Sequence, residues 1–410
     1  QINFIFTQNF TVSLIYTFLI RYYGVLLQVA SWFHPKAKAW VLGRQQWETK
    51  LRAQIPVDRK VLWFHCASLG EFDQGLPLMK SMKEEDPNLF LLVSFFSPSG
   101  MEHYQKREPM VDAACYLPLD TLHNARTFVQ IVQPVKAVFV KYEFWPNFLR
   151  ALAEKDIETI AVSAIFRPKQ IYFRWYGGFF RSALKHVHHF HVQNEASKNM
   201  LESIGIQNST ISGDLRYKRV FQAKELAMQT SNELLATFTS GFTTLILGSS
   251  WPKEEGIVRD ALQYLGTIKL IIAPHDVSES HIAAIQADFP NALRYTELDT
   301  TRDAAQLAHA QILIIDCIGQ LSAAYRYGTI AFIGGGFTGN LHNTLEPAVY
   351  GLPLLFGPKH SKFPEAELFL QKGFALEVTN ATDFSEAFHV LQNKASALRS
   401  EMEAFVTSVQ

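Results

Sequence analysis

The chain has 410 residues, of which 48% are hydrophobic and 19% charged, and its formal net charge is zero. This length allows two domains of ordinary size, and the composition excludes a disordered or fibrous protein. Zero net charge gives no reason to expect nucleic acid as a partner. Residues 1–60 nevertheless hold eight Lys or Arg against two acidic residues, which favours an anionic surface at this end. The three cysteines are far apart and lack metal-ligand spacing, so a reducing compartment is expected.

The first element is an apolar and aromatic stretch over residues 10–33, interrupted near its middle by Arg21. A full membrane span would place this charge deep in hydrocarbon, at a cost of roughly 2.5–3.5 kcal/mol. We therefore expect an interfacial anchor, with the basic residues from Lys36 onward at the lipid headgroups. A signal peptide fits less well, because no basic region precedes the apolar run. The remaining alternative is a buried amphipathic helix of the first domain.

Short apolar strands then alternate with helical patterns, which predicts α/β architecture with mostly parallel sheets. The expected strands are 61–66, 89–94, 137–140, 159–163 and 189–192, followed by 243–248, 269–273, 312–315, 329–333 and 354–356. We expect a membrane-associating segment over 1–40, an N-terminal Rossmann-like domain over 41–208 and a C-terminal Rossmann-like domain over 209–410. Residues 204–219 are expected to act as a hinge, and the last helix could pack back on the first domain. Ligands should lie in a cleft between two doubly wound, Rossmann-like domains.

Two glutamates follow predicted strands of the first domain. Glu71 lies in Ala-Ser-Leu-Gly-Glu after strand 61–66, and Glu143 lies in Glu-Phe-Trp-Pro-Asn after strand 137–140. Carboxyl ends of parallel strands meet at one edge of a sheet, so both carboxylates should converge there, and Glu71 is a candidate general base. The structural alternative is helix-dipole stabilisation for Glu71 and core packing around Glu143.

A basic and aromatic segment spans residues 167–185, with five basic residues, six aromatic residues and no acid. Such interleaving suits single-stranded nucleic acid or a phosphorylated lipid, and the apolar N-terminus favours the lipid. The histidines that follow at 186, 188, 189 and 191 would alternate between two strand faces. A metal cluster there is not expected.

The second domain carries a glycine turn, Gly334-Gly335-Gly336, after strand 329–333. A helix start follows, with Asn343 or Thr344 as cap and with Glu346 and a proline in its first turn. The glycine turn is therefore interpreted either as an anion-binding loop or as a tight structural turn. Two further strand ends carry polar groups: Ser249 and Ser250, which offer a second phosphate site, and His275, which is either a substrate contact or a structural residue.

In this order the motifs resemble the Kdo transferase family, GT-B glycosyltransferases that move 3-deoxy-D-manno-oct-2-ulosonic acid (Kdo) from CMP-Kdo to a lipid A precursor. The similar motifs are residues 67–71, residues 143–147, the Gly-Asp-Leu-Arg of 213–216 and the His-Asn-Thr-Leu-Glu-Pro of 342–347. Two departures remove basic residues: the family's Asn-Ala-Arg is Ser-Ala-Ile at 163–165, and its Pro-Arg-His is Ala-Pro-His at 273–275. Arg167 is a candidate replacement for the first.

The resemblance implies an inverting transfer onto a lipid IVA type acceptor, at the cytoplasmic face of the inner membrane. The expected catalytic residues are Glu71 and Glu143. The expected donor-binding residues are Ser249, Ser250, His275, Gly334, Gly335, Gly336, Asn343, Thr344 and Glu346, and the expected acceptor-binding residues are Ser68, Gly70, Arg167 and Arg174. No cofactor or metal is expected, because helix dipoles and basic side chains can supply the positive field. The alternatives are a GT-B enzyme or epimerase acting on another nucleotide sugar, and a non-catalytic, membrane-bound nucleotide sensor.

Overall fold

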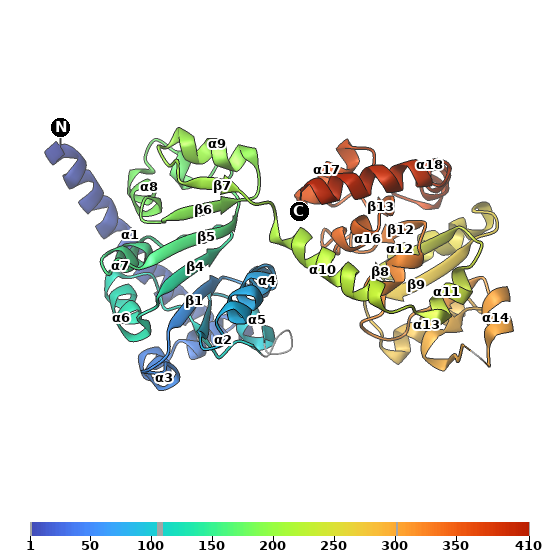
Figure 1. Cartoon of the computed structure of the whole chain (residues 1–410), viewed down its shortest axis with the longest axis horizontal. Coiled ribbons are helices and arrows are strands. Elements are labelled where there is room, and N and C mark those ends of the chain that lie inside the picture. Colours follow the sequence, from blue (N-terminus) through green and yellow to red (C-terminus); the bar gives the residue numbers. More distant parts are fainter. Residues whose placement is uncertain (1, 105–109, 301, 410) are drawn as a thin grey trace. The chain divides into compact units, whose positions relative to one another are not determined.

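The computed structural model describes residues 2–104, 110–300 and 302–409, with side chains from residue 12 onward. The side chain of Phe10, where the expected apolar stretch begins, lies outside this description. The chain divides into two compact units, Gln1–Arg216 and Tyr217–Gln410. Each unit contains one parallel sheet of seven strands with helices packed against it (Figure 1). The prediction of two doubly wound α/β domains is confirmed.

The sheet of the first unit has the strand order β3-β2-β1-β4-β5-β6-β7. Its strands are β1 (Val61–Cys66), β2 (Phe90–Phe95), β3 (Ala113–Tyr116), β4 (Lys136–Val140), β5 (Glu158–Ala164), β6 (His189–Val192) and β7 (Ser209–Ile211). Since the order reverses between β1 and β4, the loops after these two strands flank the topological switch point, where open α/β sheets bind ligands. The strand β7 lies beyond the expected boundary at residue 208 and pairs with β6, so part of the expected hinge belongs to this sheet.

The helices of this unit precede β1 or connect its strands, and hydrophobic residues are buried on both faces of the sheet. The helices are α1 (Ile2–Ala30), α2 (Pro35–Gly43), α3 (Trp47–Gln54), α4 (Leu69–Glu85), α5 (Pro98–His103), α6 (Leu122–Val132), α7 (Pro146–Ala153), α8 (Gly178–Leu184) and α9 (Glu195–Ser203), with a 3₁₀ turn η2 (Ile171–Phe173). Alternate residues of β1 enter two hydrophobic clusters, Trp63 on one face and Phe64 on the other. Burial on both faces explains why these strands are continuous apolar runs.

The sheet of the second unit has the order β10-β11-β9-β8-β12-β13-β14 and reverses between β8 and β12. Its strands are β8 (Thr244–Ser250), β9 (Lys269–Pro274), β10 (Leu293–Arg294), β11 (Ile312–Ile314), β12 (Ile330–Ile333), β13 (Leu354–Phe356) and β14 (Ala375–Glu377). The loop after β8 carries the predicted serine pair, and the loop after β12 carries the glycine turn. Both predicted donor segments therefore flank the switch point of this sheet.

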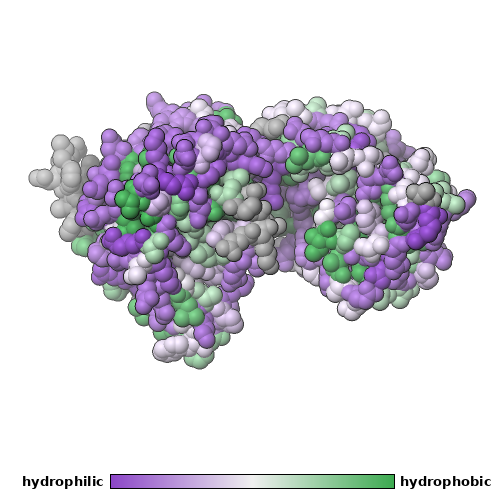
Figure 2. Space-filling view, turned by 60° about the horizontal axis from the view of Figure 1, so that its bottom comes forward, coloured by the Kyte–Doolittle hydropathy of each residue, from purple (hydrophilic) through white to green (hydrophobic). Residues whose placement is uncertain are grey.

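The helices of the second unit begin with α10 (Leu215–Gln229), which starts at the end of the first unit. The others are α11 (Glu233–Thr239), α12 (Pro252–Ala261), α13 (Glu279–Asp288), α14 (Ala304–His309), α15 (Leu321–Ala324), α16 (Leu345–Val349), α17 (Pro364–Gln371) and α18 (Ala381–Ser408), with 3₁₀ turns η3 (Leu262–Tyr264), η4 (Tyr295–Glu297) and η5 (Tyr325–Tyr327). The long last helix, α18, packs against α12, α16 and β12 of its own unit. On the face shown in Figure 2, hydrophilic residues predominate and hydrophobic ones are scattered among them.

The N-terminal helix α1 has an apolar outer face. Leu14, Ile15 and Phe18 are 56%, 53% and 68% exposed, and none of the side chains described over residues 12–30 is buried. The helix contacts α2 and α8 of the first unit, but the alternative of a buried amphipathic helix is wrong, because its apolar face is exposed. Within the described chain, Val12–Ala30 is the one helix long and apolar enough to cross a membrane. An exposed apolar helix of this kind is typical of membrane association.

Candidate functional site

The carboxylate of Glu71 lies in the first turn of α4, directly after β1. Its side chain is buried, and Oε2 accepts a hydrogen bond from the backbone amide of Ala67 at 2.5 Å. Burial, and then the charge of Glu143, raise the pKa of Glu71 to about 7. Hydrogen bonds from the backbone of Ala67 and Ser68 and the charge of Lys141 act in the opposite direction. These partners favour the ionised form, as a general base requires.

Glu143 lies across the switch point, three residues after the end of β4. Burial raises its pKa to about 7, and its Oε2 atom has no hydrogen-bond partner among the described residues. A buried carboxyl oxygen without a donor favours the protonated form. The two glutamates therefore meet as predicted, and their environments differ: polar partners stabilise the charge of Glu71, whereas Glu143 has burial alone as a cause of its shift.

The backbone around Glu143 is held by aromatic contacts. Phe144 stacks on Phe166 with ring centroids 5.8 Å apart, and the indole nitrogen of Trp145 donates to Nε2 of His65 at 3.0 Å. Burial lowers the pKa of His65 to about 3, so this ring is neutral and accepts the bond. Lys141, at the end of β4, has a φ of 77°. A non-glycine residue in this left-handed region stores strain of about 1–3 kcal/mol, which is often found at functional sites.

The predicted acceptor residues of the first unit have different settings. Ser68 caps α4 without a side-chain hydrogen bond to the helix, and Gly70 is exposed, with room for a Cβ atom that would approach only the Ser68 hydroxyl, at 4.0 Å. Arg167 is exposed. Burial, and then the charges of Glu71 and Glu143, raise the pKa of Tyr142, and the charge of Arg167 opposes this rise. Arg174 is also exposed, and its carbonyl accepts from Arg181 at 2.7 Å. Their roles in acceptor binding stay predictions.

In the second unit three rings cluster at the ends of β8, β9 and the loop after β12. Ring centroids are 4.8 Å apart for Trp251 and His275 and 4.5 Å apart for His275 and His342. The indole nitrogen of Trp251 donates to Nε2 of His342 at 3.1 Å. Burial, and then His275, lower the pKa of His342 to about 4. Because Nε2 of the neutral ring accepts this bond, the proton of His342 is on Nδ1, which is a hydrogen-bond donor.

The glycine turn after β12 packs tightly against neighbouring backbone. A Cβ atom at Gly334 would lie 2.0 Å from the carbonyl oxygen of Ser249, and one at Gly336 would lie 2.4 Å from the nitrogen of Gly357. The amide of Gly334 donates to Gly248 at 2.9 Å. The amide of Gly335 donates to Oε1 of Glu254 at 2.8 Å. Close packing thus accounts for the glycines, and their contact with a donor phosphate stays a prediction.

The serine pair after β8 divides between two environments. Ser249 is half-buried and has a φ of 51° beside a register shift between Gly248 and Ser250. Ser250 is fully buried, and its hydroxyl donates to Oε1 of Glu255 at 2.7 Å, an oxygen that also bonds His281 at 3.1 Å. This position favours a supporting role for Ser250 over direct contact with a donor.

The segment before α16 is built around Asn343. Its Oδ1 atom accepts from the amide of Leu345 at 3.0 Å, and its amide group donates to Oε1 of Glu346 at 2.9 Å. Burial raises the pKa of Glu346, and the charge of Arg219 is among the opposing causes. The hydroxyl of Thr344 is buried and has no hydrogen-bond partner among the described residues. Asn343, Thr344 and Glu346 therefore share the β12 side of the switch point with His342, as the motif predicted.

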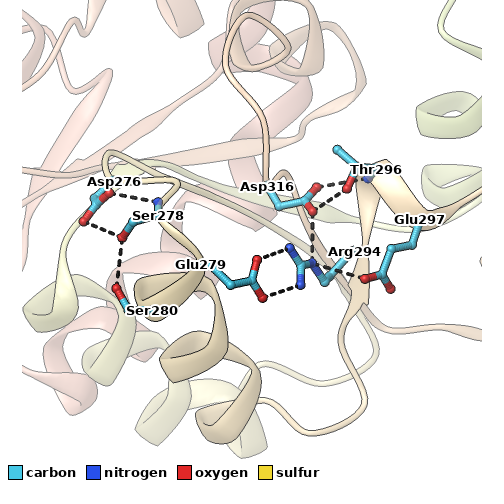
Figure 3. A network of polar contacts seen from close by, with 8 residues as sticks. All are labelled: Asp276, Ser278, Glu279, Ser280, Arg294, Thr296, Glu297 and Asp316. Carbon is cyan, nitrogen blue, oxygen red and sulfur yellow. Dashed lines mark hydrogen bonds and ion pairs between the residues drawn. The ribbon is translucent and has the colours of Figure 1, made fainter.

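An acid-rich rim of the second unit is held together by Arg294 (Figure 3). Arg294 binds both carboxyl oxygens of Glu279 at 2.8 Å and Asp316 at 3.0 Å, and Asp316 accepts from Thr296 at 2.6 Å. Within residues 2–104, 110–300 and 302–409, no group of three or more His, Cys, Asp or Glu is arranged to hold a metal ion. The rim is therefore a structural network.

Comparison with known proteins finds similarity to one enzyme family. The family model described as 3-deoxy-D-manno-octulosonic-acid transferase (kdotransferase) matches residues 44–219. The 3-deoxy-D-manno-octulosonic acid transferase of Rickettsia felis is 24% identical over 375 residues, which cover 87% of this chain and 76% of the relative. That of Aquifex aeolicus is 25% identical over 330 residues, or 78% of this chain and 83% of the relative. The chain is thus similar to Kdo transferases over most of its length. The predicted resemblance, and the prediction of a glycosyltransferase, are confirmed.

Solved structures support the fold of the chain. The UDP-GlcNAc 2-epimerase of Neisseria meningitidis has a TM-score of 0.55 at 13% identity, and covers 84% of this chain and 94% of its own. MurG of Acinetobacter baumannii has a TM-score of 0.52 at 12% identity, with 85% and 94% covered. The GT-B type fold that the sequence predicted is thereby confirmed.

Two functional candidates, Trp251 and His342, were not among the residues predicted from the sequence to bind the donor. Both stand beside predicted donor-binding residues, but only the structure brings their rings together with His275. The bond between them joins residues 91 positions apart. The sequence signal that could have identified them is their position, since each residue follows a strand of the same sheet.

Proposed function

We propose that this chain is an inverting glycosyltransferase that moves Kdo from CMP-Kdo to a lipid A precursor of the lipid IVA type. The similarity of the chain to Kdo transferases supports Kdo as the sugar that is transferred. The observation that carries the reaction type is the pair Glu71, which is buried, and Glu143, which is partly buried, two carboxylates with raised pKa values beside the switch point of the first sheet. Paired acids of this kind are typical of proton transfer at neutral pH.

In the proposed reaction, Glu71 takes the proton of the acceptor hydroxyl as the hydroxyl oxygen bonds to the anomeric carbon of Kdo. The bond between that carbon and the phosphate oxygen breaks, and CMP leaves with the electron pair as an anion. Attack from the side opposite the leaving phosphate inverts the anomeric centre. Below its pKa of about 7 Glu143 is protonated and adds no second negative charge beside the anionic donor, and above it the charge of Glu143 raises the pKa of Glu71.

The donor is proposed to bind at the switch point of the second sheet. Nδ1 of His342 is a neutral donor for a phosphate or carboxylate oxygen, and the rings of Trp251 and His275 offer flat faces beside it. The proposed donor site also includes Ser249, Asn343 and the segment to Glu346. Hydrogen bonds from fixed groups stabilise the charge that develops on CMP.

The acceptor side and the membrane are proposed to meet at the first unit. Its exposed helix α1 carries the apolar face, and Arg167 and Arg174 supply cations for the phosphates of the acceptor. We place the protein at the cytoplasmic face of the inner membrane, because a lipid acceptor and a soluble nucleotide sugar meet there.

The test is turnover by the purified full chain in vesicles that contain lipid IVA, with CMP-Kdo as donor and product identified by mass spectrometry. The expected result is CMP release together with transfer of Kdo to the lipid. Binding and turnover of UDP-sugars in place of CMP-Kdo would instead favour a GT-B enzyme or epimerase for another nucleotide sugar. Nucleotide binding without turnover of either donor would favour a sensor.

A further inference from the structure

Asp120 is a buried carboxylate that the proposed reaction does not use. It lies in the loop between β3 and α6 and is 1% exposed. Its Oδ1 atom accepts from the amide of Phe148 at 3.0 Å, and its Oδ2 atom accepts from the amide of Asn147 at 3.1 Å and from the hydroxyl of Tyr16 at 2.8 Å. Burial raises the pKa of Asp120 to about 6, while these three hydrogen bonds favour its carboxylate form.

The two amides belong to the first turn of α7, whose first residues have no hydrogen-bond acceptors inside the helix. A carboxylate at a helix N-terminus satisfies such amides and stabilises the helix dipole. The side chain of Asn147 returns a bond to the carbonyl of Asp120 at 2.7 Å. Asp120 therefore fixes the start of α7, and Glu143 lies only three residues before this helix begins.

The third bond comes from α1, the helix with the exposed apolar face. Tyr16 also packs its ring against Phe179 and Phe180 of α8, with centroids 5.5 Å away in both cases. Residues of α1 and α7 line one groove of about 910 Å³ next to these contacts. One carboxylate thus joins the helix with the apolar outer face to the segment that carries Glu143.

We propose that Asp120 is a positioning residue that joins α1 to the Glu143 segment, so that the seating of α1 on this unit sets the geometry of the catalytic carboxyl group. This inference rests on the proposed function, because the role of Asp120 depends on the catalytic role of Glu143. If Asp120 is removed, two amides of α7 and the Tyr16 hydroxyl lose their acceptor, and the segment before α7 shifts. Misplacement of about 1 Å at a catalytic group can cost 10²-fold in rate.

The experiment compares Tyr16→Phe and Asp120→Asn with the control Tyr22→Phe, which removes a hydroxyl from the exposed face of the same helix. Each variant is purified as the full chain and assayed in lipid IVA vesicles, with kcat, KM for CMP-Kdo, vesicle binding and Tm measured together. Tyr16→Phe should lower kcat roughly 3- to 10-fold, the scale of one hydrogen bond, with KM for CMP-Kdo and vesicle binding unchanged. Asp120→Asn should lower kcat further.

A purely structural bond would lower Tm and leave kcat within twofold of Tyr22→Phe, and that result would overturn the proposal. If Asp120→Asn does not fold, Tyr16→Phe decides alone, because it removes one hydroxyl and keeps the ring contacts. An inactive wild-type chain would refute the proposed function itself, and this inference would fall with it. An active wild type with unaffected variants would refute only the role of Asp120.

Discussion

The indole nitrogen of Trp251 donates to Nε2 of His342 over 3.1 Å, and this bond leaves Nδ1 of His342 as the protonated nitrogen. Trp251 thereby determines which ring nitrogen of His342 carries the proton. The Nδ1–H group of His342 is thus an uncharged hydrogen-bond donor at the point where the second sheet reverses its strand order. This point lies beside the proposed phosphate position.

Replacement of Trp251 by Phe should weaken donor binding. The variant keeps an aromatic face but removes the N–H group, so both tautomers of His342 become available and Nδ1 is no longer fixed as a donor. We expect KM for CMP-Kdo to rise roughly 3- to 10-fold, the range for one hydrogen bond. Steady-state kinetics with the lipid acceptor at saturation measures this change. The exposed Trp175, replaced by Phe, is the control and should leave KM for the donor unchanged.

The dependence of the rate on pH should report the ionisation of Glu71. A base acts in its ionised form, so kcat/KM should rise with pH to a midpoint near the raised pKa of about 7. Glu143→Gln removes the negative charge that helps to raise this pKa, so the midpoint should move to lower pH. Glu154→Gln is the matched control, because Glu154 is bound by Arg126 and Arg150 on the surface. An unmoved midpoint in Glu143→Gln would contradict the coupling of the two carboxylates.

The same substitution should affect stability in one pH range only. The pKa of Glu143 is about 7 in the folded chain against 4.5 as its ordinary value, so the unfolded chain loses this proton first as pH rises. Ionisation of Glu143 therefore destabilises the fold above about pH 5, and fully above pH 7. Glu143→Gln should stabilise the protein by roughly 1–3 kcal/mol at pH 8 and have little effect at pH 4. Denaturant unfolding at the two pH values tests this, and a loss of stability at pH 8 would contradict it.

Gly334→Ala tests the packing of the glycine turn. The new methyl group would lie 2.0 Å from the carbonyl oxygen of Ser249, so the loops after β8 and β12 must separate. We expect a loss of roughly 2–3 kcal/mol in the free energy of unfolding. Gly256→Ala is the control: its Cβ would meet nothing closer than Arg259 at 4.0 Å, and alanine in a helix should stabilise by about 0.5–1 kcal/mol. Equal stability of the two variants would show that the turn is open.

The sequence predicted the central strands well because they are apolar on both faces. Strands β1, β6 and β13 have the predicted bounds, and the other predicted strands differ by a few residues at most. The strands β3, β7, β10 and β14 were missed. They lie at or near sheet edges and have only two to four residues, several of them partly exposed, so neither length nor alternation distinguishes them from loops.

The positions of Glu71 and Glu143 were predictable because each closely follows a strand that flanks the switch point. The ring cluster was not, since it joins loops that are far apart in the sequence. Ser250 shows a further limit. The register shift at Ser249 changes which face of β8 the next side chain points to, and Ser250 therefore binds Glu255 in the interior. Regular alternation cannot reveal such a bulge.

The most direct test of the proposed mechanism is the activity of Glu71→Gln in vesicles with CMP-Kdo and lipid IVA. The side chain keeps its size and its acceptor oxygen for the Ala67 amide, so the fold should be retained, as circular dichroism and Tm will show. We predict a loss of kcat of about 10²- to 10⁴-fold, with KM for CMP-Kdo little changed. A folded Glu71→Gln protein with wild-type activity would contradict Glu71 as the base.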